Sequence, residues 1–250
     1  MRRLHSIPGS QVLAALPVLP LPNVVLLPGM MLPLNVHEPR YLELVDFVRQ
    51  TGQHIGVPLL CPLAPADPSP PGLLAIEAAP PTSPIEPVMG VGRLVFHVVL
   101  PDGRRIIRLE GVGRVKLQRE TPTGRGFREL SVVPLGEPLP VDLGQIQSLK
   151  VQVERLARYC AEDSEALLSL LTLRDDRVFL YSLTAFLPSL ELLASDIRDW
   201  VHDDHLLVSL QQRSLAAEDA DERARFLIER TTSILDRLGA PELYTGSMSN

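Results

Sequence analysis

Hydrophobic and polar residues follow two different periods in the two parts of the chain. Residues 14–140 contain short apolar runs and alternating stretches, which are typical of β-strands, whereas residues 141–240 carry apolar residues three and four positions apart, which are typical of amphipathic helices. The sequence therefore predicts an α+β protein, in which a β-rich subdomain, 14–140, precedes a helical-bundle subdomain, 141–240.

The first part of the β-rich subdomain, 16–41, combines extended apolar runs with prolines. Proline has no backbone N–H, so it confines such runs to sheet edges or to the first position of a strand. Pro28-Gly29 favours a turn, and residues 31–35 are extended again. Pro39 fits the first turn of a helix that is predicted at about 38–51.

The second part of the β-rich subdomain is predicted to contain a hairpin. Residues 88–100 alternate with a period of two and present one fully apolar face, which includes Phe96. A Pro-Asp-Gly turn then favours a return strand at 104–110, and the glycines at 111–113 are expected to bend the chain before a further strand at 114–119. These strands predict a small, partly closed barrel or twisted antiparallel sheet around one short helix.

Helix signals dominate the rest of the chain. Apolar residues repeat at spacings of three and four from Ile146 to Cys160, which predicts an amphipathic helix. Pro188 is expected to interrupt the helices and restart the chain. The last helix is expected to begin with a capping box, because Glu222 follows Asp219 by three positions.

Three segments are expected to lie outside the packed body. Residues 1–13 are predicted to be a flexible leader and residues 241–250 a tail, because termini without packing partners are usually mobile. Residues 62–87 contain nine prolines in 26 positions, so they cannot supply the N–H donors of a sheet and are predicted to form a surface excursion.

The composition is that of a globular protein without a membrane span. No run of eighteen apolar residues occurs, and the start of the chain lacks the apolar core of an export signal. Cys61 and Cys160 are therefore expected to be reduced and buried, which indicates the cytoplasm. The net charge of −6 is unevenly divided, because residues 1–140 hold 13 Lys+Arg and 11 Asp+Glu (+2) and residues 141–250 hold 11 and 19 (−8).

Three blocks in order resemble a known family. They are LPLPNVVLLPG at 19–29 with MxLPLxV at 30–36, EPRY at 38–41, and MGVGRLVFHVVLPDGRRIIRLEGVGRVKL at 89–117. The sequence resembles the N-terminal (LON substrate-binding) domain of Lon protease over about residues 14–238, and EPRY is closest to the stand-alone, bacterial form of that domain.

The resemblance implies a PUA-like β subdomain followed by a helical bundle, and a role in binding polypeptide. In Lon this domain recognises substrates that the ATPase then unfolds. A free copy is expected to be a substrate-recognition, adaptor or chaperone-like protein of protein quality control. Its expected partners are unfolded or damaged polypeptides and a Lon or other ATP-dependent protease.

Catalysis is not expected. The only lysines, Lys116 and Lys150, do not follow a glycine, so the chain has no phosphate-binding P-loop. The ATPase and Ser-Lys protease modules of full-length Lon are not part of this sequence, and no cofactor is expected. His202 and His205 flank two aspartates and could bind zinc, but no other Cys or His cluster offers further ligands, so a solvated helix face is favoured over a metal site.

Five residues near the first helix are candidates for peptide binding. Met30 and Met31 are adaptable apolar side chains beside a turn, and Glu38, Arg40 and Tyr41 follow within one helix start. The alternative is structural, with Glu38 at the helix amino end and Arg40 and Tyr41 tying the helix to the sheet. The structural role is the favoured one.

An RNA-binding module of the PUA type is the second hypothesis. Residues 93–128 hold nine Lys+Arg against three Asp+Glu, and Arg104, Arg105 and Arg108 are the candidate contacts. This stretch contains only two aromatic residues, so it offers poor platforms for stacking bases. Nucleic acid is therefore the less favoured partner.

Overall fold

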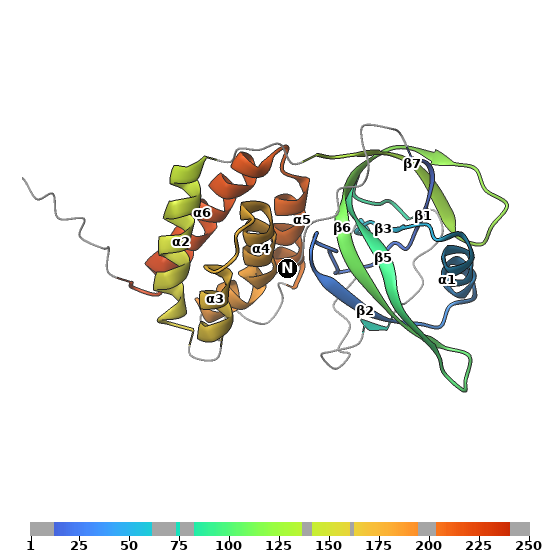
Figure 1. Cartoon of the computed structure of the whole chain (residues 1–250), viewed down its shortest axis with the longest axis horizontal. Helices are drawn as coiled ribbons and strands as arrows, with labels where there is room; N and C mark the ends of the chain where they lie inside the picture. The colour runs from blue at the N-terminus through green and yellow to red at the C-terminus, as the bar shows by residue number, and fades with distance from the viewer. Residues whose placement is uncertain are drawn as a thin grey trace, which may run out of the picture.

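The structure, a computed structural model, describes residues 13–61, 74–75, 83–136, 142–160, 163–194 and 204–240. Its strands and its long helices occupy separate parts of the molecule (Figure 1). The predicted α+β class, with the β-rich part first and the helical part second, is confirmed. The predicted leader, most of the proline-rich stretch 62–87 and the tail 241–250 lie outside the described residues.

The described strands form one seven-stranded sheet that is partly closed. The strands are β1 (Leu13–Val18), β2 (Met31–Val36), β3 (Ile55–Val57), β4 (Leu74–Ala75), β5 (Val88–Val99), β6 (Arg105–Thr121) and β7 (Arg128–Pro134). The order is β4-β2-β6-β5-β3-β1-β7, and β7 also pairs with β6, which closes five of the strands into a barrel. The prediction of an antiparallel sheet holds for most pairs, but β1–β3 and β2–β4 are parallel.

Strand β6 continues where a bend was predicted. It runs unbroken from Arg105 to Thr121, because its first part pairs with β2 and its second part pairs with β7, while β5 accompanies it along both. The glycines at 111–113 therefore do not end a strand. Strand β5 alone pairs with β6 across them, and Val112 is a bulged residue in that ladder.

Two of the sheet glycines instead allow another segment to cross closely. A Cβ atom on Gly90 would lie 1.8 Å from the carbonyl oxygen of Leu26, and one on Gly111 would lie 2.1 Å from that of Leu27. Gly111 also accepts a hydrogen bond from Gly29 and donates one to the Met30 oxygen, both at 2.8 Å. Only glycine permits this approach of one backbone to another.

Helix α1 (Pro39–Thr51) packs on the barrel at the end away from the other helices (Figure 1). Pro39 occupies the first turn, where its missing N–H costs nothing, and Gly52 ends the helix with a positive φ of 68°. The buried face of α1 joins the apolar core of β2 and β6. The predicted helix at about 38–51 is confirmed.

Five described helices form the second half of the molecule. They are α2 (Leu143–Ala157), α3 (Ser164–Leu170), α4 (Asp176–Leu193), α5 (Asp204–Ala216) and α6 (Ala220–Arg237). The predicted interruption at Pro188 is wrong, because Pro188 lies inside α4. Leu187 and Leu190 on either side of it are buried in the bundle core, and this packing outweighs the cost of about 3 kcal/mol for an internal proline.

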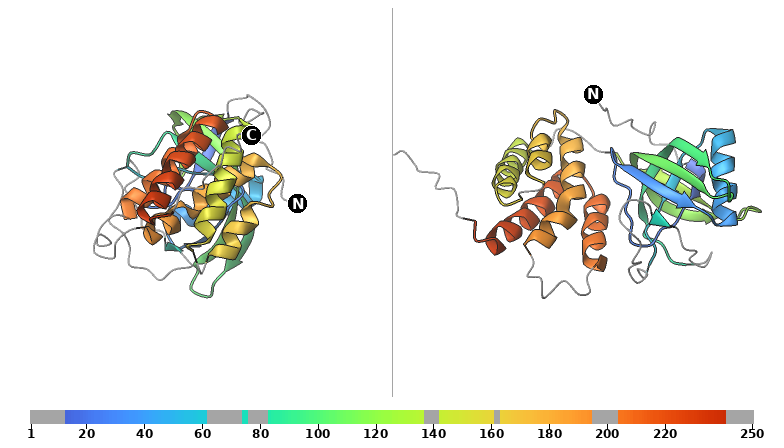
Figure 2. Two further views of the ribbon diagram at one scale, coloured as in Figure 1. Left: turned by 90° about the vertical axis from the view of Figure 1, so that its left-hand side faces the viewer. Right: turned by 90° about the horizontal axis from the view of Figure 1, so that it is seen from below.

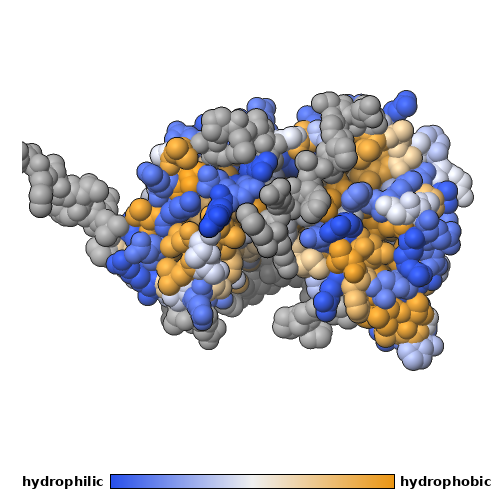
Figure 3. All heavy atoms as spheres, viewed as in Figure 1, coloured by the Kyte–Doolittle hydropathy of each residue, from blue (hydrophilic) through white to orange (hydrophobic). Residues whose placement is uncertain are grey.

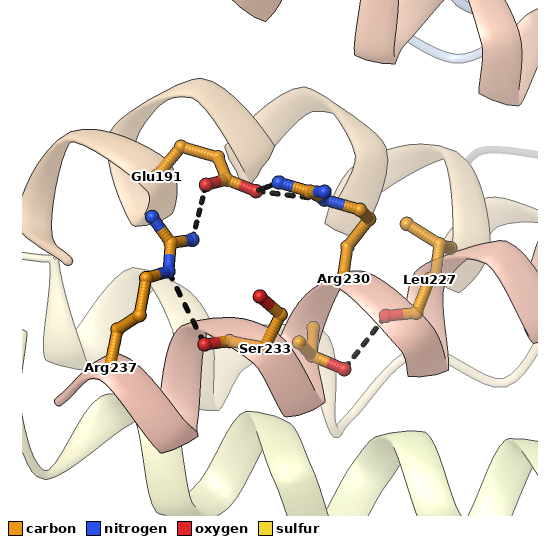
Figure 4. Close-up of polar contacts among 6 residues, drawn as sticks. Glu191, Leu227, Arg230, Ser233 and Arg237 are labelled. Atoms are coloured by element: carbon orange, nitrogen blue, oxygen red, sulfur yellow. Dashed lines mark hydrogen bonds and ion pairs between the residues drawn. The ribbon is translucent and has the colours of Figure 1, made fainter. Parts of the chain in front are cut away.

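Polar contacts hold α4 and α6 together. Glu191 of α4 is almost fully buried, and its carboxylate accepts hydrogen bonds from Arg230 and Arg237 of α6 (Figure 4). The predicted cap of α6 is formed, because the Asp219 carboxylate accepts from the Glu222 N–H at 2.7 Å, while the Glu222 carboxylate accepts from the N–H of Glu218, one residue before the N-cap. The ion pairs hold one face of α6 against α4, and the cap stabilises the amino end of α6.

Helix α5 joins the bundle to the barrel (Figure 2). An apolar cluster there combines Leu27 and Val88 from the β half with Tyr181 and Leu215 from the helical half. The side-chain amide of Gln212 donates a hydrogen bond of 2.8 Å to the Val88 oxygen. The two halves are therefore packed against each other through both apolar and polar contacts.

Arg114 of β6 is the central polar contact between the halves. Its side chain is buried, with an exposed fraction of 2%. The guanidinium donates to the carbonyl oxygens of Leu215, Ala217 and Glu218, at the carboxyl end of α5. The Leu215 oxygen belongs to the last turn of α5, which carries the negative end of the helix dipole, so the positive charge is placed where it is stabilised.

Arg114→Met is expected to lower the free energy of unfolding by about 3 kcal/mol or more, because it removes several charge-assisted hydrogen bonds and leaves buried carbonyls without donors. Urea unfolding followed by circular dichroism measures this change. Arg119→Met, on an exposed part of the same strand, is the matched control and is expected to change stability by less than about 0.5 kcal/mol. Equal effects of the two substitutions would contradict the role given to Arg114.

Candidate functional site

The sheet formed by β2, β6 and β5 has one buried face and one exposed face. Side chains of the buried face pack against α1 and include Leu32, Leu34, Ile107 and Leu109. Their neighbours in sequence point to the other side, because successive side chains of a strand alternate. This other side is here named the outer sheet face.

The outer sheet face is largely apolar. Across three adjacent strands, the strand registers place on it the apolar Met31, Pro33, Phe96, Val98 and Ile106 and the polar Asn35, Arg93, Arg108 and Glu110. Phe96 is 40% exposed, Val98 41% and Met31 40%. Figure 3 shows hydrophobic residues gathered at the end of the β half where the β5–β6 hairpin projects.

A β-bulge creates this exposure. The β5–β6 register shifts between Leu94 and Phe96, so Val95 is an extra residue without a partner. The bulge reverses the alternation, and Leu94 packs against the core while Phe96 faces solvent. The sequence predicted one apolar face with Phe96 on it, and the structure divides that face between the core and the surface.

The charges on the outer sheet face leave a net positive value. Arg93 pairs with Glu110 at 2.5 Å. The Arg108 guanidinium lies 5.1 Å from the centre of the Phe96 ring, a cation–π contact, and has no ion pair within the described residues. Arg108 therefore adds one unneutralised charge beside an exposed aromatic ring.

The five residues predicted for peptide binding lie in different environments. Met31 belongs to the outer sheet face, and Met30 is partly buried against the cluster between the two halves. Arg40 donates to the Glu38 carboxylate at 3.0 Å, and its guanidinium lies 4.6 Å from the centre of the Tyr41 ring. Because Tyr41 is buried in the core, these three residues anchor the start of α1 and do not adjoin Met31 on the surface.

The three arginines predicted for RNA binding have different partners. Arg104 pairs with Asp102 in the hairpin turn at 2.7 Å. Arg105 binds the Asp46 carboxylate of α1, and this hydrogen bond holds the pKa of Asp46 below its usual value. Only Arg108 of the three is free of a carboxylate, so they do not form one basic surface.

The thiol of Cys61 is not activated as a nucleophile. The thiol donates a hydrogen bond of 3.0 Å to the Glu86 carboxylate. Burial, and then this carboxylate, raise the pKa of the Cys61 thiol to about 11, so the reactive thiolate is scarce at neutral pH.

The described part of the chain contains neither a metal-binding cluster nor a membrane-spanning helix. No group of three His, Cys, Asp or Glu side chains there is arranged to hold a metal ion. The predicted zinc alternative at 202–205 falls on residues whose side chains lie outside the described set. None of the described helices combines the length and the hydropathy needed to cross a bilayer.

The sequence matches the model of one domain family over most of its length. The sequence model of the ATP-dependent protease La (LON) substrate-binding domain matches residues 15–236. The chain belongs to the LON substrate-binding domain family. No curated protein sequence matches this LON domain.

One of two similar solved structures supports the fold. The N-terminal domain of Mycobacterium avium complex Lon protease is similar at 14% identity and a TM-score of 0.57, over 87% of this chain and 98% of that one. A Lon N-terminal domain protein from Xanthomonas campestris is 26% identical over 70% of this chain and 99% of its own, with a TM-score of 0.41. The first likeness supports the arrangement of a sheet followed by helices.

Glu86→Gln is expected to increase the reaction of Cys61 with a thiol reagent several-fold at about pH 8, because removing the carboxylate charge lowers the pKa of the thiol. Mass spectrometry of the labelled peptides assigns the rate to Cys61. Glu165→Gln, on an exposed position of α3, is the control that should leave the rate unchanged. An unchanged rate in Glu86→Gln would mean that burial alone protects the thiol.

Proposed function

We propose that this LON domain is a non-catalytic protein that binds unfolded or damaged polypeptide segments on the outer sheet face. A bound segment is called a client below. The observation that carries the proposal is the apolar surface formed by the exposed Phe96 and Val98 of β5 and the half-buried Ile106 opposite Val98. The exposed Met31 lies on the same face, beyond Arg108 and Glu110 of β6.

The energetic basis is burial of apolar area. Exposed apolar area that a client covers contributes about 25 cal/mol per Å². Contiguous apolar surface on a folded protein marks an interaction site more often than isolated exposed side chains do. The paired strands also keep this surface in place before the client arrives, so little conformational entropy is lost on binding.

Such a surface selects unfolded segments. Folded proteins bury their apolar side chains, whereas damaged or unfinished chains expose them. We therefore assign the protein an adaptor or chaperone-like role in cytoplasmic quality control, with a Lon or other ATP-dependent protease as the recipient of the client. Unfolding and cleavage belong to that recipient.

RNA binding is the less supported alternative. The likeness of LON β subdomains to PUA-type barrels favours it. Against it, Arg104 and Arg105 are already engaged by Asp102 and Asp46, which leaves Arg108 as the one candidate free to contact a phosphate. A single arginine provides little of the electrostatic attraction that RNA binding requires.

Phe96→Ser is expected to weaken client binding about tenfold, because it removes the largest exposed apolar side chain of the outer sheet face. Fluorescence anisotropy with labelled, reduced and carboxymethylated α-lactalbumin, a permanently unfolded protein, measures the affinity. Leu168→Ser, at a similarly exposed position of α3, is the matched control. The proposal fails if both variants bind like the wild type, or if the wild type does not bind this probe.

A further inference from the structure

Strand β5 has a free edge over its second part. Of the residues of β5, only Gly90, Val91 and Gly92 pair with strand β3. From Arg93 to Val99, β5 pairs with β6 alone among the described strands. The hairpin therefore extends beyond the barrel with one side of β5 unpaired, as the projecting ribbon in Figure 1 shows.

The backbone groups on this edge can be assigned from the ladder. The Leu100 N–H donates to the Arg104 oxygen at 2.8 Å, so these two residues form a hydrogen-bonded pair. Hydrogen-bonded and non-hydrogen-bonded pairs alternate along antiparallel strands. Val99 opposite Arg105 is therefore a non-hydrogen-bonded pair, and so is His97 opposite Ile107. The N–H and C=O groups of Val99 and His97 consequently point to the free edge.

The side chains do not protect this edge. Natural edge strands are usually short or carry charges and prolines that prevent another strand from pairing. Here Val95, Phe96, Val98 and Val99 are all exposed, and Val99 is the most exposed of them at 57%. The bulge at Val95 disturbs the edge on one side, but beyond it Phe96–Val99 is a regular apolar stretch with outward backbone groups on His97 and Val99, and such a stretch is a template for another strand.

We propose that a client binds as an added β-strand along Phe96–Val99, with its backbone bonded to His97 and Val99 and alternate side chains covering Phe96 and Val98. This inference rests on the proposed function and specifies its binding mode. Because the bulge at Val95 interrupts the edge, its regular part, Phe96–Val99, holds four residues and spans roughly 13 Å at about 3.3 Å per residue. Clients are then extended, β-branched or aromatic segments without internal proline.

Charge favours a client over a second copy of this chain. Burial lowers the pKa of His97, and the positive charges of Arg49 and Arg105 lower it further against the opposing effect of Asp46. The charged side chains around the hairpin are the five arginines Arg49, Arg93, Arg104, Arg105 and Arg108 and the three acids Asp46, Asp102 and Glu110, a net charge of +2, so the potential at the edge is positive. A second copy would bring an identical positive edge opposite the first, whereas a client with acidic residues beside its apolar ones would be attracted.

Substitution of Val99 separates the backbone from the side chain. Val99→Pro removes the outward N–H without breaking a bond to β6, and proline is tolerated on an edge strand when its nitrogen faces solvent. It is expected to weaken binding of reduced, carboxymethylated α-lactalbumin about tenfold, whereas Val99→Ala is expected to weaken it less than about twofold. Thermal melting of both variants should stay close to that of the wild type.

A second measurement uses the wild-type protein, so that folding of a variant does not decide the result. A short synthetic Val/Thr peptide is compared with copies that carry an N-methyl group at one position each. Methylation should weaken binding at alternate positions only, because alternate N–H groups of an added strand face β5. Uniform effects along the peptide, or equal affinities of Val99→Pro and Val99→Ala, would overturn strand addition.

The outcomes distinguish this inference from the function on which it rests. If the wild type binds the unfolded probe but shows no dependence on backbone donors, the client lies on the outer sheet face without adding a strand. If the wild type does not bind the probe, the proposed function itself fails. If light scattering shows a dimer that Val99→Pro dissociates, a second copy occupies the edge and the inference is overturned.

Discussion

The buried guanidinium of Arg114 is the constraint on which the arrangement of the two halves depends. A charge without water or acceptors is strongly unfavourable in a protein interior, and so are the last carbonyl groups of a helix without donors. The carboxyl end of α5 and the Arg114 side chain satisfy each other, with Leu215 and Ala217 among the acceptors. Water satisfies both groups when the halves separate, but any packing that buries one without the other is penalised, so the pair selects this docked arrangement over other packed ones.

The way the barrel closes explains why exposed apolar surface is concentrated on the hairpin. Pairing of β6 with β7 leaves no free edge between these two strands, and the short strand β3 covers β5 only as far as Gly92. Beyond that point β5 has lost one neighbour, and the bulge at Val95 has turned Phe96 outward. Two local features, a short neighbour and one extra residue, therefore produce both the outer sheet face and its free edge.

Features with local causes could be predicted from the sequence, and those with distant causes could not. The helix after Pro39 and the cap at Asp219 each depend on a few adjacent residues. Pro188 was misplaced because the packing of α4 outweighs a local helix breaker. The exposure of Phe96 depends on a bulge that no residue type announces, and the acceptors of Arg114 lie 101 to 104 residues away in the chain.

The continuity of β6 has a mechanical consequence. Strand β6 forms the second arm of the hairpin and also carries Arg114, which donates a hydrogen bond to the carboxyl end of α5. Tension applied to a segment held at the hairpin would pass along covalent bonds of this strand to the helical half. The force would then act parallel to β6 and would load the hydrogen bonds of the ladders beside it together. It would not peel the hairpin away from the barrel one bond at a time.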